Sequence, residues 1–135
     1  MNVKILKKLD ELAHRLDHFF IATANKTGLP HVGVAGKCTV DLEGHIIISA
    51  WFCPGTMINL QINSKVALVL WDATVDIGYQ VLGEVETIED MAIMNGYSPE
   101  RDKIPPLPQI ERKLFIKVKE IIGFSQAPHS ELVIK

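Results

Sequence analysis

The chain is poor in cysteine, in long hydrophobic runs and in charge of one sign, and each shortage excludes a class of protein. Cys38 and Cys53 are the only cysteines among 135 residues. They are too few for a disulfide framework, and they lack the spacing of a metal site. We expect each to be a reduced, partly buried thiol. The disulfide-stabilised and zinc-binding classes of small protein are therefore not indicated.

Hydrophobic runs are short, and none approaches the length of about 20 residues that a membrane-spanning helix needs. The N-terminus also lacks the apolar segment followed by small residues that marks a secretory signal. The net charge is −2, and no basic stripe carries interleaved aromatic residues. We therefore expect a cytoplasmic protein that has neither a membrane nor a nucleic acid as its partner.

The length of the chain limits what it can enclose. A chain of 135 residues is enough for one domain, spanning residues 1–135, and not for two. A domain of this size buries only about two-thirds of the surface that its unfolded chain exposes. A pocket for a bulky cofactor would remove much of that core. Such a site is either shallow or completed by a second chain.

The hydrophobic pattern predicts a mainly β protein. Apolar residues at helical spacing predict a helix over 3–17, capped by Asn2, and a short helix over 56–63. Strands are predicted over residues 19–24, 30–42, 45–51, 65–71, 78–89 and 114–124. Residues 90–109 are predicted to form a short helix and a Pro-rich loop. Strands that follow one another through short turns favour an antiparallel sheet closing into a barrel.

Glycines lie inside two predicted strands, at Gly33, Gly36 and Gly83. Glycine weakens a strand, and it usually marks a bulge, a bend or the close approach of another group. Curvature of a barrel and the approach of a ligand both remain open for each glycine alone. Two glycines within four residues favour an approached backbone over residues 33–36.

The start of the second predicted helix is the most informative junction. A helix N-terminus offers unpaired N–H groups and the positive end of a dipole, which suit a phosphate. Thr56 can hold such an anion through its hydroxyl, and Asn59 follows one turn later. In the simpler interpretation, Thr56 caps the helix and Asn59 is a surface amide. Lys37 is the candidate countercharge, or else a solvated strand residue.

The histidines do not form a metal motif. His14 and His18 share a helical face, but no third ligand accompanies them. His31 and His45 lie near strand starts, where we expect surface positions. Trp51, at a strand end beside a loop, is a better candidate for a ligand contact than a core residue. No acid–base pair stands out, so catalytic residues stay unassigned.

From about residue 9 to residue 124, these segments resemble the FMN-binding split barrels related to pyridoxamine 5′-phosphate oxidase. One motif is the Gly-x-Pro-His entry to a strand at residues 28–31, and another is the glycine at position 83 of a later strand. The resembling segments, in chain order, are 20–24, 28–32, 46–50, 56–60, 63–68 and 80–85. Six such segments in the family's order and spacing carry the resemblance.

The resemblance implies a Greek-key split barrel, a two-fold homodimer, and FMN in a groove between the subunits. The implied flavin-binding positions are Gly33, Val34, Ala35, Gly36, Lys37, Ser49, Ala50, Trp51, Thr56 and Asn59. Residues 33–37 would line the flavin through backbone groups, with Lys37 near the phosphate. Residues 49–51 would follow the edge of the isoalloxazine ring, and the helix start would meet the phosphate. The implied activity is that of a flavin-dependent oxidoreductase or electron carrier, with a small redox substrate or an electron-transfer partner.

Two departures from the family pattern qualify this picture. Members usually carry a lysine or arginine just before the threonine of the short helix, and here that position is Gly55. The missing charge leaves open a deazaflavin or a haem in the same fold, or a binding or dimerisation module without a cofactor. Pyridoxamine phosphate oxidases also end in an Arg-x-His motif that this chain lacks, so vitamin B6 synthesis is not expected.

Overall fold

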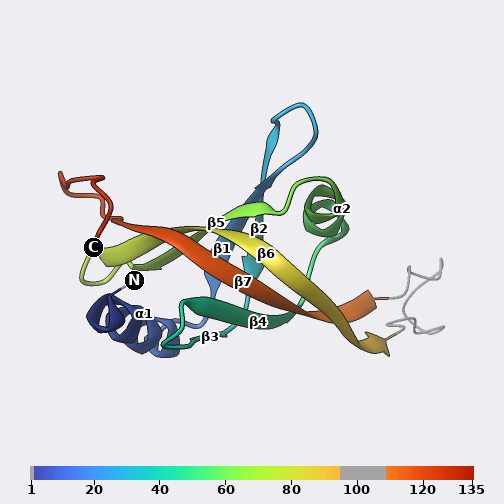
Figure 1. Ribbon diagram of the computed structural model, residues 1–135, viewed down its shortest axis with the longest axis horizontal. Helices are drawn as coiled ribbons and strands as arrows, with labels where there is room; N and C mark the ends of the chain where they lie inside the picture. The colour runs from blue at the N-terminus through green and yellow to red at the C-terminus, as the bar shows by residue number, and fades with distance from the viewer. Residues whose placement is uncertain (1, 95–108) are drawn as a thin grey trace.

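The computed structural model describes residues 2–94 and 109–135, and it is built on one antiparallel sheet with two helices (Figure 1). In chain order the elements are α1 (Val3–Arg15), β1 (Phe19–Ala24), β2 (Pro30–Ala35), β3 (Cys38–Val40), β4 (His45–Trp51), α2 (Pro54–Ile62), β5 (Lys65–Asp72), β6 (Ile77–Met94) and β7 (Gln109–Gly123). The prediction of a mainly β fold is confirmed.

Helix α1 forms as the apolar spacing predicts. The Asn2 side chain accepts a hydrogen bond from the Lys4 amide at 2.8 Å and so caps the helix. Its buried stripe packs against β3 and β5 at one end of the sheet. Asp10 ties the helix to β3 by accepting a hydrogen bond from the Val40 amide at 3.1 Å. The buried residues of α1 are Ile5, Leu6, Leu9, Leu12 and Ala13.

The strands lie in the order β2-β1-β5-β6-β7-β4-β3, and every neighbouring pair is antiparallel. Pairs β1–β5 and β7–β4 join strands that are distant in sequence, which is the mark of a Greek-key arrangement. Inward-facing side chains alternate with exposed ones along each strand, so one face of the curled sheet forms the core. The core side chains of the central strands are Ile46, Ile48, Leu68, Leu70, Val81, Leu114 and Ile116.

The prediction of one strand over residues 30–42 was wrong. Gly36 and Lys37 interrupt it, and β2 then pairs with β1 whereas β3 pairs with β4. Strands β2 and β3 are therefore the two edges of the sheet, although only two residues separate them in the chain. The sheet must curl to bring its edges this close, and the break between them is the split of the barrel.

The hairpin of β6 and β7 crosses the molecule in Figure 1 and is longer than expected. Strand β6 continues through residues 90–94, so the predicted helix does not begin there; the rest of that prediction, 95–108, lies outside the described residues. Gly83 lies at a register shift of β6 against β7, where a Cβ would lie 2.5 Å from the carbonyl oxygen of Lys117. Close approach of a neighbouring strand at a bulge explains this glycine.

Candidate functional site

Helix α2 begins directly after β4, at the end of the sheet opposite α1 (Figure 1). Pro54 takes the first helical position, where its missing N–H costs nothing. Cys53 is the N-cap, and its side chain makes no capping bond to the first turn. The predicted cap at Thr56 was wrong, because the helix starts two residues earlier. The uncapped amides of Gly55 and Thr56 suit an anion.

Gly33 lets β2 and the first turn of α2 approach each other closely. A Cβ at position 33 would lie 3.0 Å from the Thr56 hydroxyl and 3.4 Å from the Cys53 sulfur. A side chain at position 33 would require the Thr56 hydroxyl, which is buried, to shift by a few tenths of an ångström. The expected approach at Gly33 is thus made by α2, whereas a Cβ at Gly36 would meet nothing within 4 Å.

His31 lies two residues before Gly33 on the same face of β2, and its imidazole covers Gly55. A Cβ at position 55 would lie 2.8 Å from Nε2 of His31. The other ring nitrogen, Nδ1, lies 3.5 Å from the Thr56 hydroxyl. The side chain is half-buried rather than a free surface group. The missing basic side chain of α2 is therefore replaced in space by a histidine from a neighbouring strand.

The two polar residues predicted to meet a phosphate differ in their surroundings. Thr56 is only 1% exposed, and its hydroxyl lies 3.0 Å from the Cys53 sulfur as well as near His31. Asn59 is 7% exposed and donates from Nδ2 to the Thr23 hydroxyl at 3.0 Å. The Asn59 amide therefore holds α2 against β1, and its contact with a phosphate stays a prediction.

Residues 49–51 form the end of β4 that leads into α2. Ser49 is exposed and Ala50 half-buried, while the Trp51 side chain lies outside the described part of the structure. Ser49 pairs with Lys113 of β7, which places a basic residue beside the predicted ring edge. The Lys113 ammonium lies 5.4 Å from the centre of the Phe115 ring. Sequence reasoning missed Lys113, because only the strand register brings it there.

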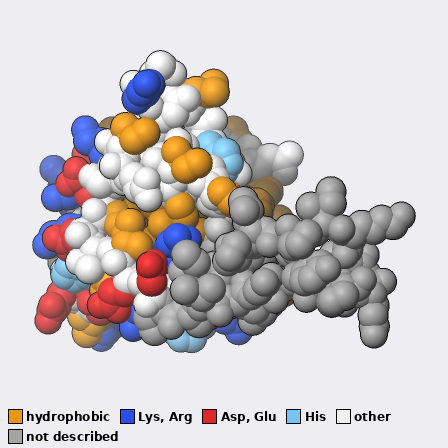
Figure 2. Space-filling model, turned by 90° about the vertical axis from the view of Figure 1, so that its right-hand side faces the viewer, with side chains coloured by type: hydrophobic (Ala, Val, Ile, Leu, Met, Phe, Trp, Pro, Cys, Tyr) orange, Lys and Arg blue, Asp and Glu red, His pale blue; other side chains and the backbone are white. Residues whose placement is uncertain are grey.

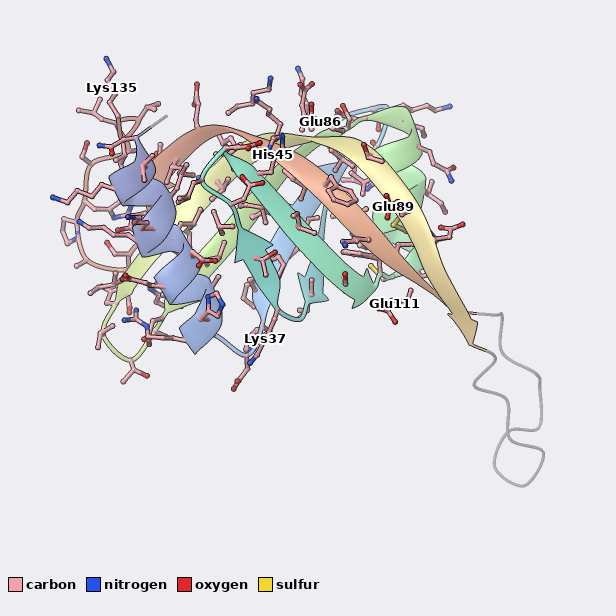
Figure 3. The ribbon with its side chains drawn as sticks, turned by 60° about the horizontal axis from the view of Figure 1, so that its bottom comes forward. Lys37, His45, Glu86, Glu89, Glu111 and Lys135 are labelled. Carbon is pink, nitrogen blue, oxygen red and sulfur yellow. The ribbon has the colours of Figure 1, made fainter. Side chains whose placement is uncertain are left out.

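Lys37 does not join the cluster around Thr56. It is exposed, and Figure 3 shows it near the end of α1, well separated from α2. Val34 is exposed on the outer face of β2, and Ala35 is buried in the core. Gly33, Thr56 and His31 are thus brought together, and Lys37 is placed elsewhere within one protomer.

A second group of polar side chains lies on the β3–β4 hairpin. His45 and Glu86 lie side by side in Figure 3, with Nε2 of His45 3.1 Å from a Glu86 carboxylate oxygen. Asp41 accepts hydrogen bonds from the amides of Glu43 and His45, at 2.9 Å each. This side chain closes the turn in the usual way for an aspartate. Hydrogen bonds within the hairpin, together with the contact to Glu86 of β6, account for the cluster.

The outer face of the sheet, on the side away from the core, carries a shallow apolar groove of about 660 Å³. Its floor includes Ala22, Ala67 and Leu82, from β1, β5 and β6, and Lys119 and Glu84 stand at its rim. Beside it, exposed apolar side chains of β1 and β2 extend the same face, because Ala22 pairs with Val32 and Phe20 with Val34. The exposed fractions are 38% for Phe20, 62% for Val32 and 59% for Val34.

The α2 end of the molecule is shown in Figure 2. Hydrophobic and uncharged side chains cover much of the upper part of this face, and Lys, Arg, Asp and Glu gather toward its left edge.

The family of the chain follows from a family model described as pyridoxamine 5′-phosphate oxidase, which matches residues 5–117. The chain belongs to the pyridoxamine 5′-phosphate oxidase family. The matched segment includes α1, the whole of β1 to β5 and the α2 junction. The family resemblance inferred from the sequence is therefore confirmed. No curated protein matches the chain.

Solved structures share the fold of this chain. HupZ of Group A Streptococcus is 18% identical, with a TM-score of 0.66 over 92% of this chain and 97% of that one. An FMN-binding protein from Syntrophomonas wolfei is 16% identical, with a TM-score of 0.62 over 93% and 89%. An F420 reductase is 17% identical, with a TM-score of 0.59 over 83% and 94%. These neighbours confirm the split-barrel fold of this pyridoxamine 5′-phosphate oxidase family member. Among the described residues, neither helix is long and apolar enough to span a membrane.

Proposed function

We propose that the protein binds FMN and works as a cytoplasmic, flavin-dependent oxidoreductase or electron carrier. The observation that carries this proposal is the junction of β2 and α2. Because Gly33 has no side chain, the Thr56 hydroxyl lies only 3.0 Å from the position that a Cβ of residue 33 would take. This contact is beside the start of α2, where no side chain caps the helix. Two backbone amides, a hydroxyl and an imidazole are a donor set that fits a phosphate monoester.

The flavin would supply the redox chemistry, and the protein would bind and orient it. The first turn of α2 would hold the phosphate through the amides of Gly55 and Thr56. Ser49 and Ala50, at the end of β4, would lie along the ring, with the backbone of residues 33–37 at the end of β2 and in the break that follows it. Lys37 projects away from α2 in its own protomer, so we assign it to the ring side rather than to the phosphate.

A second copy would complete the site. On the outer sheet face, the exposed apolar side chains of Phe20, Val32 and Val34 lie on paired strands, and contiguous exposed apolar side chains mark interaction sites. We propose that this face is the homodimer interface, continuous with the groove above Ala67 and Leu82. A chain of 135 residues would then enclose its cofactor between two barrels instead of hollowing out its own core.

A deazaflavin is the alternative cofactor, favoured by the F420 reductase among the structural neighbours. Both ligands carry a phosphate and a tricyclic ring, so the same junction would serve either. Pyridoxamine phosphate oxidation itself is not proposed, because the chain lacks the Arg-x-His motif. Mass spectrometry of the cofactor extracted from purified protein separates the two ligands.

The test is a fluorescence titration of the protein with FMN and with riboflavin, which lacks the phosphate. Thr56→Ala removes one phosphate donor, and we expect it to weaken FMN about tenfold or more while changing riboflavin little. Thr74→Ala, in the exposed turn before β6, is the matched control and should bind FMN as the wild type does. Equal affinity of wild type and Thr56→Ala for FMN would show that the phosphate does not bind at this junction.

A further inference from the structure

The imidazole of His31 covers the residue of α2 at which a cation is missing. Gly55 has no side chain, and the ring of His31 fills the space that a side chain would take, 2.8 Å from the ideal Cβ position. A side chain at position 55 would require the His31 imidazole to move from this place. The cluster is therefore built from two elements, and it is not a property of the helix start alone.

The ring is also oriented. Its Nδ1 is shared with the Thr56 hydroxyl at 3.5 Å, and Thr56 is fixed because it is 1% exposed and contacts the Cys53 sulfur. Among the hydrogen bonds of the described residues, Nε2 of His31 takes no part. A histidine whose second nitrogen is engaged by the protein presents the first as a defined donor or acceptor.

We propose that His31 is the cationic phosphate-binding residue of this site, in place of a basic residue on α2, and that it makes cofactor affinity depend on pH. This inference rests on the proposed function. The imidazolium would donate from Nε2 to a phosphate oxygen, in a charge-assisted hydrogen bond that neutral imidazole cannot replace. Gly55 is then a requirement of the arrangement, because it makes room for the ring.

Few other ionisable groups face His31. On β1 its cross-strand partner is the uncharged Thr23, and on α2 the first turn carries no acidic residue. Cys53, at the N-cap, is the ionisable side chain that α2 contributes near the cluster. None of the ion pairs recorded for the described residues includes His31. Protonation of His31 would therefore add a positive charge at the proposed phosphate position that no carboxylate of residues 2–94 or 109–135 is recorded as pairing with.

The sign of the pH effect follows from this charge. Histidine changes its charge between about pH 5 and pH 8. A proton on the His31 ring would strengthen its bond to the phosphate, so this residue is expected to make FMN bind more tightly at lower pH. The phosphate itself takes up a proton near pH 6, which acts in the opposite direction. The difference between wild type and a variant without the imidazole isolates the contribution of His31.

The experiment measures dissociation constants for FMN and riboflavin at pH 6, 7 and 8, for wild type, His31→Gln, His31→Lys and His14→Gln. His14 lies on α1 at the opposite end of the molecule and controls for a general loss of histidine charge (Figure 1). We expect His31→Gln to weaken FMN about tenfold at pH 6 and much less at pH 8. For His31→Lys, the affinity for FMN should change between pH 6 and pH 8 only through the titration of the phosphate itself. The affinity for riboflavin should be the same in the wild type and in all three variants. Circular dichroism confirms that each variant is folded.

The outcomes separate this inference from the proposed function. If wild type and His31→Gln bind FMN with the same affinity at every pH, His31 is not the cationic residue that binds the phosphate. The proposed flavin site is not contradicted by that result. If His31→Gln fails to fold, the wild-type affinities for FMN and riboflavin decide, since a pH-independent ratio between them overturns the inference. If the wild type binds neither FMN nor riboflavin, the proposed function itself is wrong and the inference falls with it.

Discussion

The imidazole of His31 lies in the space that a side chain at Gly55 would take: a Cβ on Gly55 would lie 2.8 Å from Nε2 of His31. Alanine favours a helix by up to about 1 kcal/mol over glycine, but here it would displace the imidazole. We expect Gly55→Ala to destabilise the protein when His31 is present and to stabilise it in a His31→Ala background. The expected coupling is about 0.5–3 kcal/mol, measured by urea unfolding of the four proteins. Additive effects of the two changes would contradict the contact.

The two cysteines differ in reactivity. Burial, with a smaller contribution from Asp10, raises the pKa of Cys38 to about 12, so its thiol is protonated and enclosed at neutral pH. Cys53 is exposed at the start of α2. In the native protein we expect a thiol reagent to label one cysteine per chain quickly, and Cys53→Ser to abolish that fast phase. FMN should slow it, because the Cys53 sulfur contacts Thr56. Fast labelling of Cys38 would show that the core is open.

Asp76 holds the C-terminal segment. Its carboxylate accepts hydrogen bonds from the amides of Gln126 and Ala127, at 2.7 and 3.0 Å, and these bonds lower its pKa below the usual 3.8. A carboxyl with a depressed pKa stabilises the fold above its unfolded value and loses that contribution as the pH falls through the folded value. Stabilisation by Asp76 is therefore complete at neutral pH and is lost below about pH 4.

The matching experiment replaces Asp76 by asparagine, which tolerates the positive φ of 54° at this position. At pH 7, Asp76→Asn should speed hydrogen exchange at the amides of Gln126 and Ala127. Glu131→Gln, in the same exposed segment, should not. The difference between wild type and Asp76→Asn should shrink as the pH is lowered toward 3. A difference that grows in acid would contradict the depressed pKa.

The proposed dimer depends on the outer face of β1 and β2. Val34 is 59% exposed at its centre, opposite Phe20. A glutamate there would bury a charge at the interface without disturbing the core, so we expect Val34→Glu to be monomeric by light scattering and still folded. It should also bind FMN more weakly, because the second chain completes the site. Thr39→Glu, exposed on the other edge strand, is the control. A Val34→Glu dimer would place the interface elsewhere.

Local pattern was sufficient for most of the fold. The stripe of α1, the alternation in β4 and β5, and the turn at Gly44 are each determined by residues close in sequence. The break at Gly36 and Lys37 could not be read in this way, since both flanking segments have strand character. It shows only in the pairing of β2 with β1 and of β3 with β4.

The site was harder to predict than the fold. Thr56 and Gly33 were singled out from the sequence, and they do meet. His31 was expected at the surface. Its contact with Gly55 was missed because the two residues are 24 positions apart in the chain, and no local rule links them. Asn59 was expected either to meet the phosphate or to be a surface amide; it is buried and donates to Thr23, so the surface position is wrong and the phosphate contact stays a prediction. Lys37 was chosen for its charge, its place on a Gly-rich segment and the family resemblance; it follows the end of β2 and lies apart from the Thr56 cluster within one protomer, so its role near the phosphate stays a prediction.

The most direct test of the flavin proposal is the absorption spectrum of the purified protein after incubation with FMN and removal of free flavin by gel filtration. We predict visible flavin bands that elute with a dimer in near-stoichiometric amount. The bands should be weaker in Thr56→Ala and unchanged in Thr74→Ala. A well-folded, colourless protein that retains no FMN would contradict it, and Gly55 would then mark a site that has lost its flavin.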